Sequence, residues 1–451
     1  VNGKGESMTF ENKGKENNGA TYGRRSDWQN LYTIAKKYYE ALLADPGNAQ
    51  FHLTDPRGAS DKSGRTFNNP YQYFFEQMHM DDAIYADESI YEYPMQQGGG
   101  NDGRPYSFGR PSSGGSKAAY PCKSYGQGRI NPAYFYGIFD PNDMRRDVSI
   151  TMTGSNGKGV EKLIPFVPNS KAEGGGLTLN KWDENRQANP WVAAQRKSGI
   201  NGPYMRMSEV YLGYAEVCAA LGDVVTGKQY LKTVRERSFP QGLADTDGFI
   251  ASFGNDLVRA IIEERGFEYA GEGDRRWTLI RSGYLPEDIK RIKDMTKAMM
   301  DGLATKGYYE FENGNIISAY IWTKLVDAKT IYGHRLTAQC PMDKVNDPVL
   351  YPGWRGQKDN WEEMGLNYGN SAPATNLAIK GLFEIVSEEE AASLESQGYA
   401  KVNWGIDLVD YRDEYDKYLF WDYDYVSAPI YLWPFTPNVM AAGGFTNGYG
   451  F

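Results

Sequence analysis

Residues 254–283, GNDLVRAIIEERGFEYAGEGDRRWTLIRSG, constrain the fold of this chain more than any other segment. On a helix over the first half of this segment, Glu264 and Glu268 fall on the same face as the apolar stripe. Carboxylates aligned with a core stripe are costly unless they are paired. Basic partners follow a glycine-containing break, on a second helix that Asp274 can cap. The segment therefore predicts a helical hairpin closed by a structural ion network. The members of this network are Glu264, Glu268, Arg275 and Arg281.

Composition excludes several classes of partner. The 451 residues carry 49 basic and 58 acidic side chains, a net charge of −9, whereas a nucleic-acid binder needs a basic stripe. The chain has 34 tyrosines and only 3 histidines, which favours flat contact surfaces over histidine-based chemistry. No apolar run approaches the length of a membrane span, and residues 1–19 contain no signal-peptide core.

Sequence motifs for metal or cofactor binding are also missing. His52, His79 and His334 lack metal-ligand spacing, and no phosphate-binding loop, dinucleotide fingerprint or serine elbow appears. The three cysteines are odd in number and define no disulfide framework. Cys218 lies at helical spacing with apolar neighbours, which predicts a small buried hydrophobe. We expect neither a cofactor nor a metal.

Helical periodicity places a scaffold at 27–44 and 205–302. The segments within 205–302 are separated by short turns, as in stacked antiparallel hairpins of the tetratricopeptide (TPR) type. A capping box at Ser387 and Glu390 predicts one further short helix. The helices expected within 205–302 are 205–221, 227–237, 254–271, 274–282 and 286–302.

The other two regions, 66–200 and 303–451, are irregular in this interpretation. They form the ligand-facing and C-terminal regions of the domain. Strand-like runs occur at Val148–Thr153 and Lys162–Val167, and residues 418–451 are aromatic and strand-like, then glycine-rich. The prediction is one mainly α domain over 1–451, with helical hairpins, a large irregular loop and a region of short strands.

The long loop 96–128 is the strongest candidate for a binding surface. Loops of this length in a compact domain are usually functional or disordered. Aromatic faces stack on sugar rings, while amide and guanidinium groups bond hydroxyls. The alternative is that these aromatic residues pin the loop onto the core. Trp354, in a second cluster at 351–361, could extend the face or cover the core. The predicted ligand-binding residues are Gln96, Asn101, Arg104, Tyr106, Phe108, Tyr120, Tyr125 and Trp354.

The acidic run 407–418 suggests a carboxylate pair such as that of a glycoside hydrolase, with Asp410 and Glu414 as the candidates. Acidic residues that alternate with tyrosine and arginine more often form a solvated or ion-paired face. Residues 140–147 resemble a calcium loop but lack its glycine and terminal glutamate.

Several segments, in their order along the chain, resemble the SusD/RagB family of Bacteroidetes. These are RMSEVYLGYAEVCAALGD at 206–223, KTVRERS at 232–238 and DESIYEY at 87–93, with DPNDMRRDVSITMT at 140–153. The family pattern of Glu-Arg, then Glu, then Glu-Gly-x-Arg-x-x-Asp-Leu-x-Arg is met within 264–281, although Thr278 replaces the usual Asp. The residues that match the pattern are Glu264, Arg265, Glu268, Glu272, Gly273, Arg275, Leu279 and Arg281.

The resemblance implies a SusD-like fold and a non-enzymatic, lipid-anchored nutrient-binding protein on the extracellular face of the outer membrane. It would bind an oligosaccharide or polysaccharide and deliver it to a SusC-like TonB-dependent transporter. The lipobox cysteine and the first helices of the family are missing here, so a trimmed fragment is expected, with no other contact to the membrane. A glycoside hydrolase, a binder of peptides or other nutrients, and a scaffold without ligand affinity remain open alternatives.

Overall fold

The structure is a computed structural model of the chain. It describes residues 8–9, 21–22, 27–56, 69–79, 85–100, 103–113, 123–156, 160–169, 174–184, 191, 194–327, 375–419 and 436–444.

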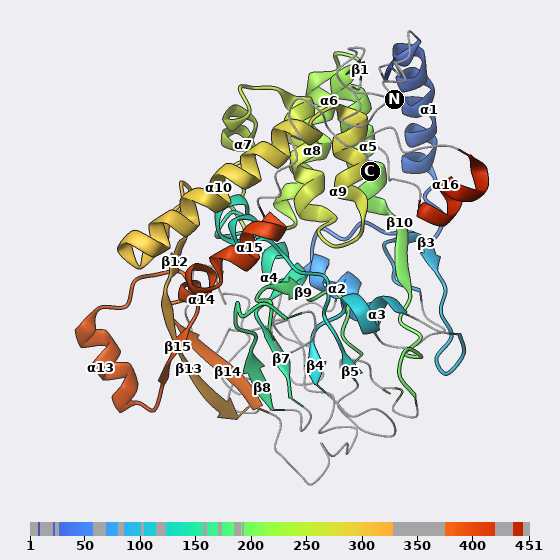
Figure 1. The fold of residues 1–451 in the computed structure, drawn as a ribbon. Helices are drawn as coiled ribbons and strands as arrows, with labels where there is room; N and C mark the ends of the chain where they lie inside the picture. The colour runs from blue at the N-terminus through green and yellow to red at the C-terminus, as the bar shows by residue number, and fades with distance from the viewer. Residues whose placement is uncertain are drawn as a thin grey trace.

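A stack of helices forms the upper part of the molecule in Figure 1, and short strands form the lower part. The predicted helical scaffold is confirmed, with an additional short helix, α7, that the sequence did not predict. Helices α5, α6 and α8 pack against one another, and α1 packs against α5. The scaffold helices are α1 (Trp28–Ala44), α5 (Met207–Ala220), α6 (Val224–Glu236), α7 (Thr246–Ser252), α8 (Leu257–Glu268), α9 (Asp274–Ser282) and α10 (Leu285–Lys306).

Local capping explains where these helices begin. The side chain of Asp223 accepts a hydrogen bond from the amide of Thr226 at the start of α6, and Asp256 does the same for Arg259 in α8. Asp274, which was expected to cap α9, is instead the first residue of that helix. The N-cap residue of α9 is Gly273, whose φ of 92° is accessible mainly to glycine.

The hairpins enclose an aliphatic core at the centre of the scaffold. Leu212 of α5, Leu231 of α6 and Ile261 of α8 are fully buried in this core. Cys218 is buried in a neighbouring cluster between α1 and α5, as predicted. Gly213 allows α1 to approach α5 closely. A Cβ at this position would overlap the phenol ring of Tyr39.

Short antiparallel sheets make up the strand region. β3 (Ser89–Tyr93) pairs with β10 (Gly202–Arg206), and β13 (Tyr320–Asp327) lies between β14 (Thr375–Lys380) and β15 (Ala400–Asn403). The smaller strands are β1 (Met8–Thr9), β2 (Thr21–Tyr22), β4 (Ser112–Ser113), β5 (Lys123–Ser124), β6 (Ile150–Thr151), β7 (Thr153–Ser155), β8 (Glu161–Leu163), β9 (Thr178–Leu179), β11 (Tyr308–Glu310) and β12 (Ile316–Ser318).

A second and larger core joins the scaffold to the strand region. Phe267 of α8 and Met299 of α10 pack in this cluster with Ile379 of β14. Within it, the indole Nε1 of Trp404 donates a 2.8 Å hydrogen bond to the hydroxyl of Tyr136. The shared core fixes the strand region against the helices.

Several irregular segments contain more structure than the sequence predicted. The start of the predicted strand at Val148 belongs to helix α4 (Arg145–Ser149), where the side chain of Asp143 accepts from the amide of Arg145. The predicted loop 96–128 contains helix α3 (Gly103–Phe108) and strands β4 and β5. The tail contains helix α16 (Pro437–Gly443), and its aromatic, strand-like part at 420–435 lies outside the described residues. The other short helices are α2 (Pro70–Gln77), η1 (Tyr134–Ile138), α13 (Glu388–Ser396), α14 (Gly405–Asp410) and α15 (Arg412–Leu419).

Among the described residues, none of the helices has the length and apolarity to cross a membrane.

Candidate ligand-binding site

Glu264 and Glu268 are completely buried in an ion cluster, but their partners differ from those predicted. Arg145 Nη1 lies 2.7 Å from Glu264 Oε1 and 3.0 Å from Glu268 Oε2. Glu264 also accepts from Arg235 at 2.6 Å. Glu268 accepts from Arg206 and Arg237, each at 2.6 Å. The cluster thus draws its four arginines from three separate segments of the chain, since Arg235 and Arg237 both lie at the end of α6.

The prediction that Arg275 and Arg281 hold these glutamates is wrong, because α9 packs against other faces of its neighbours. Arg275 pairs with Glu263 at 2.7 Å and with Asp288, whereas Arg281 pairs with Glu216 of α5. The hairpin of α8 and α9 is still closed by ion pairs. These are Arg275–Glu263 and a 2.6 Å pair between Arg265 and Asp274.

The pKa shifts within the cluster indicate a structural role. Burial alone would raise the pKa of Glu268, but Arg237, followed by Arg206 and Arg145, lowers it well below its usual range. Burial lowers the pKa of Lys181 to about 8, although Glu272 accepts from its ammonium at 2.7 Å. Since Glu264 and Glu268 are fully enclosed and bound by arginines, we assign them to architecture.

The sheet of β3 and β10 presents an exposed aromatic surface, which we call the tyrosine ledge. It consists of Tyr91, Tyr93 and Tyr204, which are 54%, 54% and 78% exposed. The rings of Tyr91 and Tyr204 meet edge to face at 5.5 Å. On the opposite face, Glu92 is buried and accepts from Asn201 Nδ2 at 2.8 Å. The alternation of a strand thus places the tyrosines outward and the carboxylate inward.

The ion cluster anchors both strands of the tyrosine ledge. Glu88 directly precedes β3, and its Oε1 lies 2.9 Å from Nη1 of Arg206, the last residue of β10. Arg237 binds the second oxygen of Glu88 at 2.5 Å, and Arg206 also reaches Glu268. The ledge is therefore tied at its base to the helical scaffold.

Among the residues predicted to bind ligand, Tyr106 is enclosed. It is only 4% exposed, and the guanidinium of Arg196 lies 4.4 Å from its ring centroid. Its ring is 5.0 Å from that of Tyr125, which Lys123 approaches at 5.4 Å. Burial, followed by the hydrogen bond with Tyr125, raises the pKa of Tyr106. Tyr106 thus pins its segment, the alternative role that the sequence left open.

Other predicted residues lie nearer to solvent. Gln96 is exposed, and Phe108 is 47% exposed at the end of α3. The guanidinium of Arg104 lies 5.9 Å from the ring centroid of Trp182 and directly over Gly202, where a Cβ would overlap it. Gly202 is paired with Tyr93, and partners across an antiparallel ladder share a face, so Arg104 lies beside the tyrosine ledge. Asn101, Tyr120 and Trp354 lie outside the described residues.

The other candidate chemistries gain no support. Asp410 ends α14 and Glu414 is on α15, and both are exposed to solvent. The neighbouring Arg412 pairs with Asp301, as expected for a solvated, ion-paired face. The described residues contain no group of three acidic, histidine or cysteine side chains suited to a metal.

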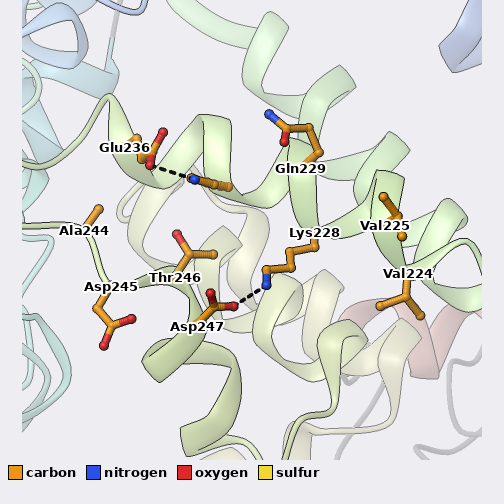
Figure 2. A pocket seen from close by; sticks show the side chains of 10 residues that line it. Val224, Val225, Lys228, Gln229, Glu236, Ala244, Asp245, Thr246 and Asp247 are labelled. Atoms are coloured by element: carbon orange, nitrogen blue, oxygen red, sulfur yellow. Dashed lines mark ion pairs between the residues drawn. The ribbon is translucent and has the colours of Figure 1, made fainter. Parts of the chain in front are cut away.

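Two adjoining surface grooves of about 490 and 540 Å³ lie along α6 and α7. Figure 2 shows the first groove, with Lys228 directed at Asp247. Lys232 of the same groove pairs with Glu236. Each lysine thus already has a carboxylate partner within the groove. The groove lacks exposed aromatic faces among its lining residues, unlike the tyrosine ledge.

Sequence reasoning missed the tyrosine ledge, although its signal was present. Segment 87–93 was noted for its resemblance to the family, and strand alternation there places Tyr91 and Tyr93 on one face. Tyr204 could not be joined to them from the sequence, because the pairing spans more than a hundred residues.

A model of the SusD family matches residues 49–434. A curated relative, the SusD-like protein P25 of Formosa agariphila, is 28% identical over 160 residues, which cover 35% of this chain and 26% of the relative. A solved SusD homolog from Bacteroides thetaiotaomicron aligns at 16% identity with a TM-score of 0.40, over 61% of this chain and 56% of the homolog. Surface glycan-binding protein A from the same species, solved with laminarihexaose, aligns at 18% identity with a TM-score of 0.40, over 58% of this chain and 52% of the other. The chain matches about a quarter of the curated relative and about half of each solved chain.

Proposed function

Because the chain belongs to the SusD family, we propose that it is a cell-surface protein that binds glycans at the tyrosine ledge. SusD-family members are non-catalytic binding proteins. The observation that carries the proposal is the outward display of Tyr91, Tyr93 and Tyr204 on a sheet anchored to the scaffold. Flat aromatic faces on a rigid support suit the apolar faces of sugar rings, and they cost little side-chain entropy on binding.

Polar groups beside the ledge would fix the orientation of the ligand. Arg104 lies next to Tyr93, and Gln96 follows β3 directly in the chain. Both can bond sugar hydroxyls. Asn101, Tyr120 and Trp354 belong to the same proposed site on sequence grounds. Tyr106 and Tyr125 would support the site through their mutual ring contact, and Phe108 would add an exposed ring from the end of α3.

The wider proposal is that the protein is lipid-anchored on the extracellular face of the outer membrane. There it would deliver oligosaccharide to a SusC-like TonB-dependent transporter, with the helical hairpins as the transporter-facing surface. Family membership supports this arrangement, since transport after capture requires reversible binding without bond cleavage. Co-purification with a SusC-like transporter tests it, and transport that is unchanged by loss of this protein would contradict it.

Glycan binding is tested by affinity electrophoresis and calorimetry with a panel of oligosaccharides. We expect Tyr91→Ala and Tyr204→Ala each to weaken binding about fivefold to tenfold, since a stacked ring contributes about 1 kcal/mol or slightly more. Tyr38→Ala is the matched control, because Tyr38 is also exposed but lies on α1. Release of shortened products would support the hydrolase alternative. Retention of peptides without glycans would instead favour binding of another nutrient.

A further inference from the structure

The proposed binding face is strongly basic although the chain as a whole is acidic. Four cations lie on the ledge or on segments that contact its neighbours, and we call them the cationic rim. The described residues within 94–113, 123–130 and 194–202 contain no acidic side chain, and Asp102 lies outside the described residues. The net charge of the whole chain is −9. The rim consists of Arg104, Lys123, Arg196 and Lys197.

Ring contacts and backbone hydrogen bonds link the segments that carry these cations. Arg196 and Lys123 lie against Tyr106 and Tyr125, two rings that touch each other. Lys197 is joined to the turn after β3, because its carbonyl accepts from the amide of Gly98 at 2.9 Å. Arg104 lies over Gly202 on the face of the ledge. Arg104 therefore lies beside the ledge, and the other three rim cations come from segments that contact α3 or the turn after β3.

Three of the rim cations, Lys123, Arg196 and Lys197, differ from the arginines that hold the fold together. Arg110, in the same region, is bound by Glu161 and lies 3.6 Å from Asp183. By contrast, no carboxylate among the described residues lies within ion-pair distance of Lys123, Arg196 or Lys197. A basic surface attracts anionic ligands, and its field adds to the attraction at each contact.

The backbone of Arg196 supports a functional role. Its φ is 61°, in the left-handed region that non-glycine residues rarely adopt. Such residues concentrate at ligand sites, where surrounding structure sustains the strain. Here the strained turn holds an exposed guanidinium over Tyr106 beside the proposed site.

We infer that the ligand is an acidic saccharide, bearing carboxylate or sulfate groups along its chain. The tyrosine ledge stacks on its sugar rings, and Lys123, Arg196 and Lys197 bind its anionic groups. This inference rests on the proposed glycan-binding function and specifies the class of glycan.

Calorimetry with matched oligosaccharides tests the inference. A uronic acid oligosaccharide is compared with its carboxyl-reduced form, and a sulfated oligosaccharide with its desulfated form. We expect at least one acidic form to bind about tenfold or more tighter than its neutral counterpart, as one or two charge-assisted contacts would give. This advantage should shrink markedly in 0.5 M salt, because exposed charges are screened within a few ångströms there. The pair that shows the advantage identifies the anionic group.

Variants locate the effect. Arg196→Asn removes the charge with a residue that tolerates the left-handed conformation, and Lys123→Gln removes a second charge independently. Each substitution should weaken binding of the acidic oligosaccharide about tenfold and binding of the neutral one less than twofold. The control Lys232→Gln also removes one positive charge, but on α6, and it should change neither of the two affinities.

Equal affinities for acidic and neutral forms in both pairs would overturn the inference and leave the proposed function standing. Binding of acidic forms that survives both Arg196→Asn and Lys123→Gln unchanged would also overturn it. Failure to bind any oligosaccharide would overturn the proposed function itself. Thermal melting of each variant separates a lost contact from a lost fold.

Discussion

Replacement of Glu268 by alanine should destabilise the fold far more than it weakens ligand binding. Glu268 has no exposed surface, and it accepts from Arg206, Arg237 and Arg145 at 2.6, 2.6 and 3.0 Å. Removing one partner from a buried ion pair typically costs about 3–5 kcal/mol, because the remaining charge stays buried without compensation. Arg206 and Arg237 retain Glu88, so the loss should stay within this range.

The expected shift in melting temperature follows from the size of the chain. Unfolding entropy near the midpoint is about 2 cal/mol/K for each residue, which gives about 1 kcal/mol/K for a chain of 451 residues. A cost of 3–5 kcal/mol therefore lowers the melting temperature by about 3–5 °C if the chain unfolds as one unit. Calorimetric scans provide the assay. Glu236→Ala, on an exposed ion pair of α6, should shift the midpoint by well under 1 °C.

Oligosaccharide affinity measured on the same samples completes the test. The anchor between Glu88 and Arg206 survives in Glu268→Ala, so the tyrosine ledge should keep its position and its affinity within about threefold. A variant that melts normally but binds glycan tenfold more weakly would refute the structural assignment of Glu268.

Three further outcomes are expected. Burial would raise the pKa of Glu263, but Arg275, ahead of Arg291 and Arg259, lowers it from 4.5 to about 2. The folded state thus stays deprotonated where the unfolded state is protonated, so about 3 kcal/mol of stability is lost as pH falls from 4.5 to 2. In urea unfolding, wild type and Glu263→Gln should converge over this range, and parallel curves would contradict the assignment. Gly202→Ala should displace the guanidinium of Arg104 and weaken acidic glycans severalfold in calorimetry, whereas Gly103→Ala, with open space around its Cβ, should not. Ser387→Ala should remove the cap of α13 and raise amide exchange in its first turn by roughly fivefold, as expected for the loss of about 1 kcal/mol.

The helical half of the fold was predictable because its information is local. The predicted helix at 27–44 agrees with α1, and Ser387 caps α13 as its spacing indicated. Period, capping residues and glycine stops act within a few positions of the chain, so a single sequence contains them. Helix α7 was missed because its seven residues are too few to establish a period.

The partners of the buried charges could not be predicted in the same way. Sequence proximity suggested Arg275 and Arg281 for Glu264 and Glu268, yet the actual partners include Arg145, more than a hundred residues away. A helix has several faces, and only tertiary packing decides which of them meets a given neighbour. The sequence could show that the carboxylates needed cations, but not which cations.

The same distinction explains the candidate site. Tyr106 was predicted as a contact because aromatic residues and glycines alternate around it, but residue type does not distinguish a buried ring from an exposed one. Whether a side chain of a strand is exposed depends on which face of the strand the rest of the protein covers. In β3 the covered face carries Glu92, whose buried carboxylate accepts hydrogen bonds from Asn201 and Ser89. A buried, fully bonded carboxylate on one face thus fixes the exposure of Tyr91 and Tyr93 on the other.

The ion cluster and the tyrosine ledge are consequently parts of one arrangement. Glu268 ends α8 of the scaffold, and Arg206 ends a strand of the ledge, so their 2.6 Å contact joins the two halves of the molecule. Glu88 extends this link to the second strand. Charged partners specify distance and orientation more narrowly than apolar contacts do, since guanidinium and carboxylate groups have fixed geometry. The cluster therefore stabilises the fold and also determines where the ledge stands. This explains how residues without ligand contact can hold a binding surface in place.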